Sequence, residues 1–336
     1  MSTTIRDVAH KAGVGPATVS RVLNNSPLVS ETTRQRVLSA IAELDFTPNP
    51  TARRLSLGKT QTIAAIVPFF TRPSAVERLR GVDNALMDSQ YDLIVFNVES
   101  VERRDRCFRE VPRPDRVDGV IIVSFTPTPA QAAALRQAGV PVVLLDARHP
   151  DLASIMEDSV AGGRQATEHL ISLGHRRIAY LSDVFDDPFN YTSRSRFRYE
   201  GYGAALQAAH LPARPEYLVQ GEHGREPARH LAQALLDLPE PPTAIFAASD
   251  TQALGVLEAA RARGRRVPED LSVIGYDDLE VAEYLGLTTV RQALFDSGRL
   301  SAEYLLTAIA EPLTPPAQAT LTTKLVVRRT TAPPAP

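Results

Sequence analysis

The alternation of short apolar runs with helical segments is the feature that most restricts how this chain folds. From Ile63 onward, each apolar run leads into polar or Pro-containing residues and then into a segment with helical spacing, such as Val160–Leu173 or Thr251–Arg263. A repeated strand–helix order produces parallel sheets that helices cover on both faces. The number of runs suits two α/β lobes better than a single sheet. The expected strands are Ile63–Phe70, Tyr91–Val98, Gly119–Phe125, Pro141–Asp146, Arg177–Ser182, Tyr217–Gly221, Ala244–Ala248 and Leu271–Tyr276.

The beginning of the chain has a different pattern, with two short amphipathic helices around a Gly-Val-Gly turn. Gly13 permits the sharp reversal, and Pro16 stands at the first position of the second helix, where no backbone N–H is needed. The apolar faces comprise Ile5, Val8, Ala9 and Ala12 in the first helix and Val19, Val22 and Leu23 in the second. Small or polar residues face outward from the second helix, namely Ala17, Thr18, Ser20, Arg21 and Asn24. This layout predicts a helix-turn-helix whose second helix enters a DNA major groove, although ordinary helical cores also contain such pairs.

The context of these helices favours the DNA-binding interpretation. Thr4 and Asp7 form a capping pattern for the first helix, and Ser30 begins a third helical segment. Apolar residues at helical spacing in that segment are expected to close a three-helix core; they are Val37, Leu38, Ile41 and Leu44. Residues 1–60 carry eight Lys/Arg against four Asp/Glu, whereas the whole chain has a net charge of −2. A positive head on an acidic body suits a protein that touches DNA phosphates at one end.

The head and the segment after it resemble the lac repressor (LacI/GalR) family of bacterial transcription regulators. Residues 4–24 follow the family pattern T-I-x-D-V-A-x-x-A-G-V-S-x-x-T-V-S-R-V-L-N, except that Gly15 replaces the usual serine cap. The resemblance implies DNA contacts from Thr4, Pro16, Ala17, Thr18, Ser20, Arg21, Asn24, Asn49, Ala52, Arg53 and Leu55. Neither Pro16 nor Ala17 has a side-chain donor, so base discrimination there must use apolar contacts or DNA shape.

The segment Asn49–Leu57 is expected to be a hinge helix. A helix of this length is unstable alone in water, so it should form only against a second copy, which predicts a dimer on a palindromic operator. Leu55 stands where the family inserts a leucine into the minor groove, and such a wedge kinks DNA. The alternative is a flexible Arg-rich tether with Leu55 tucked against the body.

The body continues the resemblance, which implies two Rossmann-like lobes of the type I periplasmic-binding-protein-like fold. The chain should cross between the lobes near residues 160, 290 and 320. Three segments match family signatures, at Arg194–Tyr202, Phe246–Gly255 and Val273–Asp278. The implied domains are a helix-turn-helix domain at 1–47, a hinge at 48–60, an effector-binding and dimerisation domain at 61–330 and a Pro-rich tail at 331–336.

The effector site is predicted from strand ends and from the family motifs. In an open α/β sheet, ligands bind at the carboxyl ends of the strands, and carboxylates, Arg and aromatic rings suit a sugar. The candidates are Phe69, Arg72, Ser74, Phe125, Asp146, Arg198, His223, Asp250 and Asp277. Two alternatives remain open: Asp250 caps the helix that follows it, and Arg198 with Asp277 is a plain ion pair. Ser74 and Ala75 replace an aromatic pair of the family, so ligand specificity cannot be taken over from a known member.

The sequence lacks the motifs that other classes of protein require. The chain has no P-loop, dinucleotide-binding glycine motif or G-x-S-x-G motif, its His residues lack metal-ligand spacing, and it has one cysteine, Cys107. We therefore expect no enzyme, cofactor or metal site. No apolar run is long enough to span a membrane and no signal stretch is present, which indicates a cytoplasmic protein and disfavours a transport component. The expected function is a sugar-responsive repressor of a carbohydrate uptake or catabolism operon, with a nucleoside or purine as the alternative effector.

Overall fold

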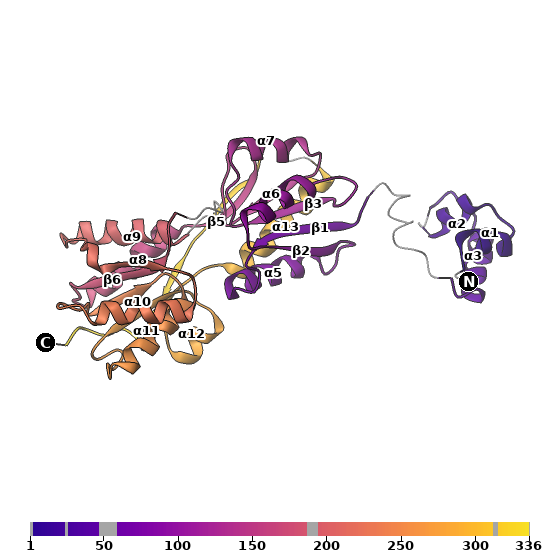
Figure 1. Ribbon diagram of the computed structural model, residues 1–336. Helices are drawn as coiled ribbons and strands as arrows, with labels where there is room; N and C mark the ends of the chain where they lie inside the picture. The colour runs from indigo at the N-terminus through magenta and orange to yellow at the C-terminus, as the bar shows by residue number, and fades with distance from the viewer. Residues whose placement is uncertain (1–2, 24–25, 47–58, 187–193, 312–314, 336) are drawn as a thin grey trace. The chain divides into compact units, whose positions relative to one another are not determined.

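The computed structural model describes residues 3–23, 26–46, 59–186, 194–311 and 315–335 (Figure 1). The chain divides into two compact units, Met1–Thr60 and Gln61–Pro336. The predicted positions Asn24, Asn49, Ala52, Arg53 and Leu55, and almost all of the hinge, lie outside the described residues.

The first unit contains the three predicted helices. These are α1 (Ile5–Ala12), α2 (Pro16–Leu23) and α3 (Glu31–Glu43). Thr4 and Asp7 form a reciprocal capping box at the start of α1, and Ser30 caps α3. The helices enclose a small core that includes Val8, Val19 and Val37. The prediction for Leu38 was wrong: its side chain is 44% exposed, because Val37 and Ala40 supply the face of α3 that turns inward.

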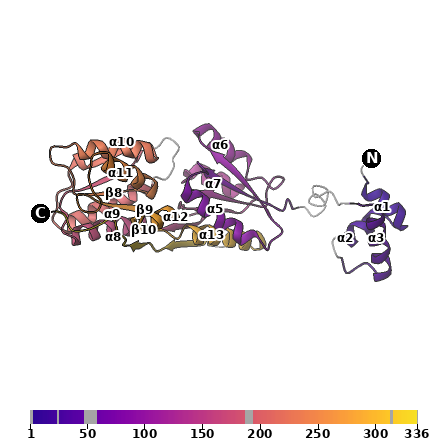
Figure 2. The same cartoon turned by 90° about the horizontal axis from the view of Figure 1, so that it is seen from below.

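The second unit consists of two lobes, each built on a six-stranded sheet (Figures 1 and 2). The first sheet has the strand order β11-β5-β4-β3-β1-β2, and all its neighbouring strands are parallel. Its strands are β1 (Thr62–Pro68), β2 (Asp92–Val98), β3 (Gly119–Val123), β4 (Val142–Leu145), β5 (Ala153–Glu157) and β11 (Gln318–Leu321).

Helices cover both faces of the first sheet. Alternate residues of β3 pack to opposite sides, with Val120 and Ile122 in one core and Ile121 and Val123 in the other. One face is covered by α6 (Val101–Glu110) and α7 (Pro129–Gln137), and the other by α5 (Pro73–Leu86) and α13 (Leu294–Ala310). The sheet is therefore buried on both sides, as its continuous apolar runs predicted.

The second sheet has the order β12-β10-β9-β8-β6-β7, with only β10 and β12 antiparallel among its pairs. Its strands are β6 (Ile178–Asp183), β7 (Leu218–Gly221), β8 (Ala244–Ala247), β9 (Ser272–Asp277), β10 (Thr288–Arg291) and β12 (Lys324–Val326). The covering helices are α8 (Ser159–Ser172) and α9 (Arg194–Ala208) on one face, and α10 (Arg225–Leu236), α11 (Asp250–Ala262) and α12 (Glu280–Leu285) on the other. A short 3-10 helix, Pro215–Tyr217, precedes β7.

The chain passes between the two lobes three times, after Glu157, after Arg291 and after Leu321. These crossings lie close to the expected residues 160, 290 and 320. The last residues remain attached to the second lobe, because Ala332 donates its N–H to Ser272 Oγ at 3.0 Å and its carbonyl oxygen accepts a hydrogen bond from His175 Nε2 at 2.9 Å. The described chain after residue 330 is therefore part of this lobe.

Two glycines allow close helix packing beside the cleft. A Cβ on Gly163 of α8 would lie 2.1 Å from the carbonyl oxygen of Arg198 on α9. A Cβ on Gly298 of α13 would likewise lie 1.9 Å from the carbonyl oxygen of Arg78 on α5. Backbone atoms cannot move aside easily, so both positions require glycine. The close packing also fixes the backbone positions of Arg198 and Arg78, from which their side chains extend.

We predict that Gly163→Ala lowers the free energy of unfolding by about 1–3 kcal/mol, since the added methyl group forces α8 and α9 apart. Urea denaturation followed by circular dichroism measures this change. Gly203→Ala in α9 is the matched control: apart from its chain neighbours and the backbone of its own helix, no atom lies within 4 Å of its Cβ position. The control should be neutral or up to about 1 kcal/mol more stable because alanine favours a helix. Equal effects in the two variants would contradict the packing argument.

Candidate functional site

The outer face of α2 carries the residues predicted to contact DNA. Ala17 and Arg21 are exposed, Thr18 and Ser20 are half-buried, and Pro16 begins the helix. The carbonyl group of Gly15 accepts hydrogen bonds from the N–H groups of Thr18 at 2.9 Å and of Val19. Val19 and Val22 are buried in the head, so the orientation of α2 is fixed and its polar side is left accessible.

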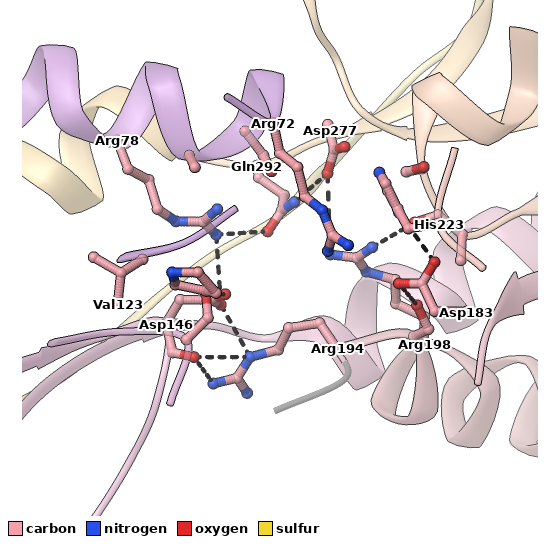
Figure 3. Close-up of a pocket in the computed structure, with 17 residues that line it drawn as sticks. Arg72, Arg78, Val123, Asp146, Asp183, Arg194, Arg198, His223, Asp277 and Gln292 are labelled. Atoms are coloured by element: carbon pink, nitrogen blue, oxygen red, sulfur yellow. Dashed lines mark hydrogen bonds and ion pairs between the residues drawn. The ribbon is translucent and has the colours of Figure 1, made fainter. Parts of the chain in front are cut away.

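The second candidate site is a cavity at the carboxyl ends of strands from both sheets. The side chains leave about 50 Å³ between them, far less than the roughly 300–1,000 Å³ typical of small-molecule pockets, so a sugar-sized ligand requires some of them to move. Residues from both lobes and from the crossing after β10 line the cavity (Figure 3). Its polar and charged lining residues are Arg72, Ser74, Arg78, Ser124, Asp146, Asp183, Arg194, Ser195, Arg198, His223, Ser249, Asp277 and Gln292.

Asp146 joins the two lobes across this cavity. It follows β4 of the first lobe, and its carboxylate accepts a hydrogen bond from Ser124 Oγ at 2.7 Å. Arg194 of α9, in the second lobe, places Nε 2.9 Å from Asp146 Oδ1 and also donates to the Asp146 carbonyl oxygen. Arg78 of α5 places Nη2 3.4 Å from the same Oδ1 atom. Burial alone would raise the pKa of Asp146, but the two guanidinium groups outweigh it and hold the pKa below its ordinary value.

Arg198 and Asp277 face each other in the second lobe. Arg198 Nη2 lies 4.0 Å from Asp277 Oδ1, and Nη1 donates to the carbonyl oxygen of Ala248. The Arg198 guanidinium lies over the Tyr276 ring, 3.8 Å from its centroid. Asp277 also accepts a hydrogen bond from Gln292 Nε2. Complete burial raises the pKa of Asp277 to about 6, because Arg198 and Arg78 compensate only part of the desolvation.

Asp183 and His223 form a third polar group at the cavity wall. His223 Nδ1 lies 3.0 Å from Asp183 Oδ1, and Gln252 Nε2 donates to the same oxygen at 2.9 Å. Burial would raise the pKa of Asp183, but the hydrogen bond with His223 and the nearby positive charges outweigh it and lower the pKa. Donors and acceptors therefore alternate around the cavity, an arrangement that suits the hydroxyl groups of a polyol.

Six of the nine predicted effector residues line the cavity. They are Arg72, Ser74, Asp146, Arg198, His223 and Asp277. Phe69 lies in an adjoining depression with Arg72 and His223, and its ring stacks against Arg72 at 4.2 Å.

Two predicted effector residues lie elsewhere. Phe125 is 1% exposed in the apolar core under α6, where its ring meets Phe108 edge-on at 6.0 Å. The backbone turns at Ser124, which has a φ of 56°, and this turn directs Phe125 away from the cavity. Asp250 is fully buried at the start of α11, where its carboxylate accepts hydrogen bonds from the Leu279 N–H at 2.8 Å and from Thr289 Oγ1 at 2.6 Å. Asp250 therefore braces the second sheet.

Besides serines, the polar residues of the cavity that sequence reasoning missed are Arg78, Asp183, Arg194 and Gln292. Asp183 directly follows the predicted strand Arg177–Ser182, so the strand-end rule could have found it. Arg194 begins the segment that was singled out for Arg198, one helical turn away. The sequence carries no comparable signal for Arg78, which lies inside a helix.

Among the residues that the structure describes, no group of three or more His, Cys, Asp or Glu residues is placed to hold a metal ion. No helix among the described residues is long and apolar enough to cross a membrane.

The fold and the two sites define a class of protein in which a helix-turn-helix head precedes a two-lobed, periplasmic-binding-protein-like body. Family models agree with both parts: "Bacterial regulatory proteins, lacI family" matches residues 4–49, and "Periplasmic binding protein-like domain" matches residues 167–331. The ribose operon repressor of Escherichia coli (strain K12) is 35% identical over 314 residues, covering 92% of this chain and 94% of that protein. The chain belongs to the lacI family of bacterial regulatory proteins.

Solved structures agree with this assignment. The lac repressor dimer bound to operator and an anti-inducer has a TM-score of 0.86 and 29% identity, covering 99% of this chain and 100% of that one. The transcriptional regulator CelR in complex with cellobiose has a TM-score of 0.72 and 34% identity, covering 98% of this chain and 99% of that one. The chain is thus a DNA-binding transcription regulator rather than an enzyme.

We predict that Asp277→Asn changes the pH dependence of stability. In the folded protein Asp277 holds its proton up to a pH of about 6, whereas an unfolded Asp titrates near pH 4. Its stabilising contribution is therefore largest at low pH and is lost as the pH rises through 6. The wild type should lose about 1 kcal/mol more than the variant between pH 5 and pH 7.

Urea denaturation of both proteins at several pH values measures this difference. Asp88→Asn, at an exposed position, controls for the general effect of removing a carboxylate. A constant difference between the wild type and Asp277→Asn across this range would show that burial does not perturb Asp277.

Proposed function

We propose that the protein represses an operon for carbohydrate uptake or catabolism, and that a sugar or sugar derivative bound between the lobes controls its affinity for the operator. The observation that carries this proposal is the cavity of buried, alternating charges, which both lobes and a crossing segment line. The cellobiose complex of one relative and the name of the ribose operon repressor support a sugar as the ligand class. Action on the chromosome places the protein in the cytoplasm.

The effector contacts proposed in the cavity come from Arg72, Ser74, Asp146, Arg198, His223 and Asp277, with Phe69 at its edge. In such a site the Arg side chains donate hydrogen bonds to sugar hydroxyl groups, and the carboxylates accept hydrogen bonds from neighbouring hydroxyl groups. Because little space remains between these side chains, the ligand displaces some of them from their present partners. A ligand that changes contacts between the lobes binds two arrangements of the lobes with different affinity. This difference in affinity is what shifts the population from one arrangement to the other.

The DNA contacts proposed for the head come from the exposed side of α2. Ala17 and Pro16 offer apolar surface to a thymine methyl group, while Arg21, Thr18 and Ser20 donate to bases or phosphates. Thr4, Asn24 and the hinge residues Asn49, Ala52, Arg53 and Leu55 remain proposed contacts, with Leu55 as the minor-groove wedge. Ligand binding would weaken or strengthen the packing of the two hinges against each other. A coupling free energy of about 1–3 kcal/mol between the two sites alters operator affinity roughly 5–150-fold.

A homodimer is proposed because a palindromic operator requires two heads. The body offers apolar surface for such an interface: Ile94 and Val95 on the edge strand β2 are 45% and 38% exposed. On α12, Tyr284 is 83% exposed and Leu285 is 37% exposed. Edge strands and exposed apolar patches of this kind commonly mark protein–protein contacts.

The test of this function is selection of duplexes from a random library, followed by fluorescence anisotropy of the selected duplex with candidate sugars and nucleosides. We expect a palindrome whose affinity changes with a sugar and not with a nucleoside. Arg21→Ala should weaken binding of that palindrome roughly 5–150-fold, because a base or phosphate contact is lost.

Arg36→Ala is the matched control for this experiment. It removes the same charge from an exposed position on α3, outside the helix-turn-helix. Equal losses in the two variants would show that the head binds DNA only through its net charge. A nucleoside as the responsive compound would replace the sugar in the proposal, and no enriched duplex would count against the function as a whole.

We predict that Ile94→Asp converts the dimer to a monomer at micromolar concentration, since a carboxylate on the edge strand would be buried without a partner. Sedimentation velocity measures the state of assembly. Val327→Asp introduces the same charge at a side chain that is 56% exposed and lies outside β2 and α12, and it should remain dimeric. A dimeric Ile94→Asp variant would place the interface on another surface.

A further inference from the structure

Helix α9 directs two guanidinium groups into the cleft, one helical turn apart. Arg194 and Arg198 are each 7% exposed and lie on the same face of the helix (Figure 3). Both direct hydrogen bonds to neutral backbone carbonyl groups: Arg194 donates to the carbonyl of Asp146, and Arg198 to that of Ala248. Arg194 also lies 2.9 Å from one carboxylate oxygen of Asp146, and the carboxylate nearest to Arg198 is 4.0 Å away, so the remaining donors of both cations rely on uncharged acceptors.

Arginines on the surface of the same lobes are paired differently. Arg266 donates to both carboxylate oxygens of Asp270 at 3.0 and 2.9 Å, and Arg113 donates to both oxygens of Asp115 at 3.0 Å. This two-bond geometry is the preferred way for a guanidinium to bind a carboxylate. The strong pairs thus occur where water already solvates the charges.

Neither cleft arginine on α9 has a two-bond carboxylate partner among the described residues. The carboxylate of Asp277 lies 4.0 Å from Arg198 Nη2, and the buried Arg198 Nε has no hydrogen-bond partner in the described chain. The carboxylate of Asp146 offers Arg194 a single oxygen, Oδ1, which Arg78 also contacts. A buried donor without a partner costs free energy, so this arrangement favours a ligand that supplies the missing acceptor.

The charges that line the cavity point the same way. Four arginines line it, against the three carboxylates Asp146, Asp183 and Asp277. Glu157 lies 3.4 Å behind Arg78 and does not line the cavity. With Glu157 counted, four carboxylates balance the four arginines, so the site has no excess of positive charge to hold a dianionic phosphate and suits a monoanion better.

We propose that the effector carries a carboxylate, which accepts hydrogen bonds from Arg194 and Arg198, while its hydroxyl groups meet Asp183 and Asp277. The ligand class is a sugar acid with one carboxylate. The carboxylate replaces the backbone carbonyls as partner of the two guanidinium groups, since a charged acceptor forms the stronger hydrogen bond. This inference rests on the proposed function only in placing the effector between the lobes.

The first experiment compares matched ligands by isothermal titration calorimetry with the full-length protein at pH 7.5 and 0.15 M salt. The pairs are D-glucuronate with D-glucose and D-galacturonate with D-galactose, and D-glucose 6-phosphate tests the dianion. At least one uronate should bind about ten- to a hundredfold more tightly than its neutral partner. Tighter binding of the neutral sugars or of the phosphate, or binding of neither uronate, would overturn the proposal.

The second experiment uses substitutions on α9. Arg194→Gln should abolish the preference for the uronate, and Arg194→Lys should keep part of it because the charge remains without the two-bond geometry. Arg196→Gln is the matched control, since Arg196 lies on the same helix with its side chain 59% exposed and pairs with Asp186. A preference that survives Arg194→Gln, or that Arg196→Gln removes equally, would rule out Arg194 as the anion contact.

Operator binding by the same preparations separates this inference from the proposed function. A protein that binds its selected duplex and responds to a neutral sugar but to no uronate would retain the function and refute the sugar acid. A protein that binds a uronate but no duplex would retain the sugar acid and refute the function. If Arg194→Gln does not fold, the wild-type ligand pairs still decide the question.

Discussion

The ionic contact between Arg194 and Asp146 is the interaction on which the cleft depends, because it joins side chains of different lobes. Both partners are buried, with exposed fractions of 7% and 4%. Removing one partner of such a pair would leave an uncompensated charge, at a cost of about 3–5 kcal/mol. Asp146 also accepts from Ser124 and contacts Arg78, so one carboxylate ties the ends of β3 and β4 to α5 and α9. Charge compensation, more than apolar packing, sets the geometry of this cleft.

The apolar cores act on the site indirectly, through the helices that carry the arginines. Gly163 and Gly298 each touch the backbone carbonyl of a cleft arginine, Arg198 and Arg78 respectively. A methyl group at either glycine would therefore shift a guanidinium group as well as a helix. Stability and ligand recognition are coupled at these two contacts, since the side chains that bind ligand start from backbone positions fixed by packing.

The sequence predicted what depends on local pattern and missed what depends on tertiary packing. Apolar runs identified eight strands, whereas β5, β10, β11 and β12 could not be found from such runs because each mixes polar with apolar residues. Asp146 and Asp277 followed from the strand-end rule, but Phe125 did not obey it because the chain turns at Ser124. Arg78 could not be found from the sequence. The packing of α13 against α5 decides which face of α5 lies toward the cleft, and the sequence does not show this packing.

The exchange of partners at α9 accounts for how a small ligand could control the helix-turn-helix. The carbonyl that Arg194 holds belongs to Asp146 in the other lobe, so a ligand carboxylate that takes its place alters a contact between lobes. A hydrogen bond to a charged group contributes about 1.5–3 kcal/mol. Allosteric coupling between two sites commonly amounts to about 1–3 kcal/mol. One exchange of this kind is therefore large enough to bias the lobes, and no extensive rearrangement of either core is required.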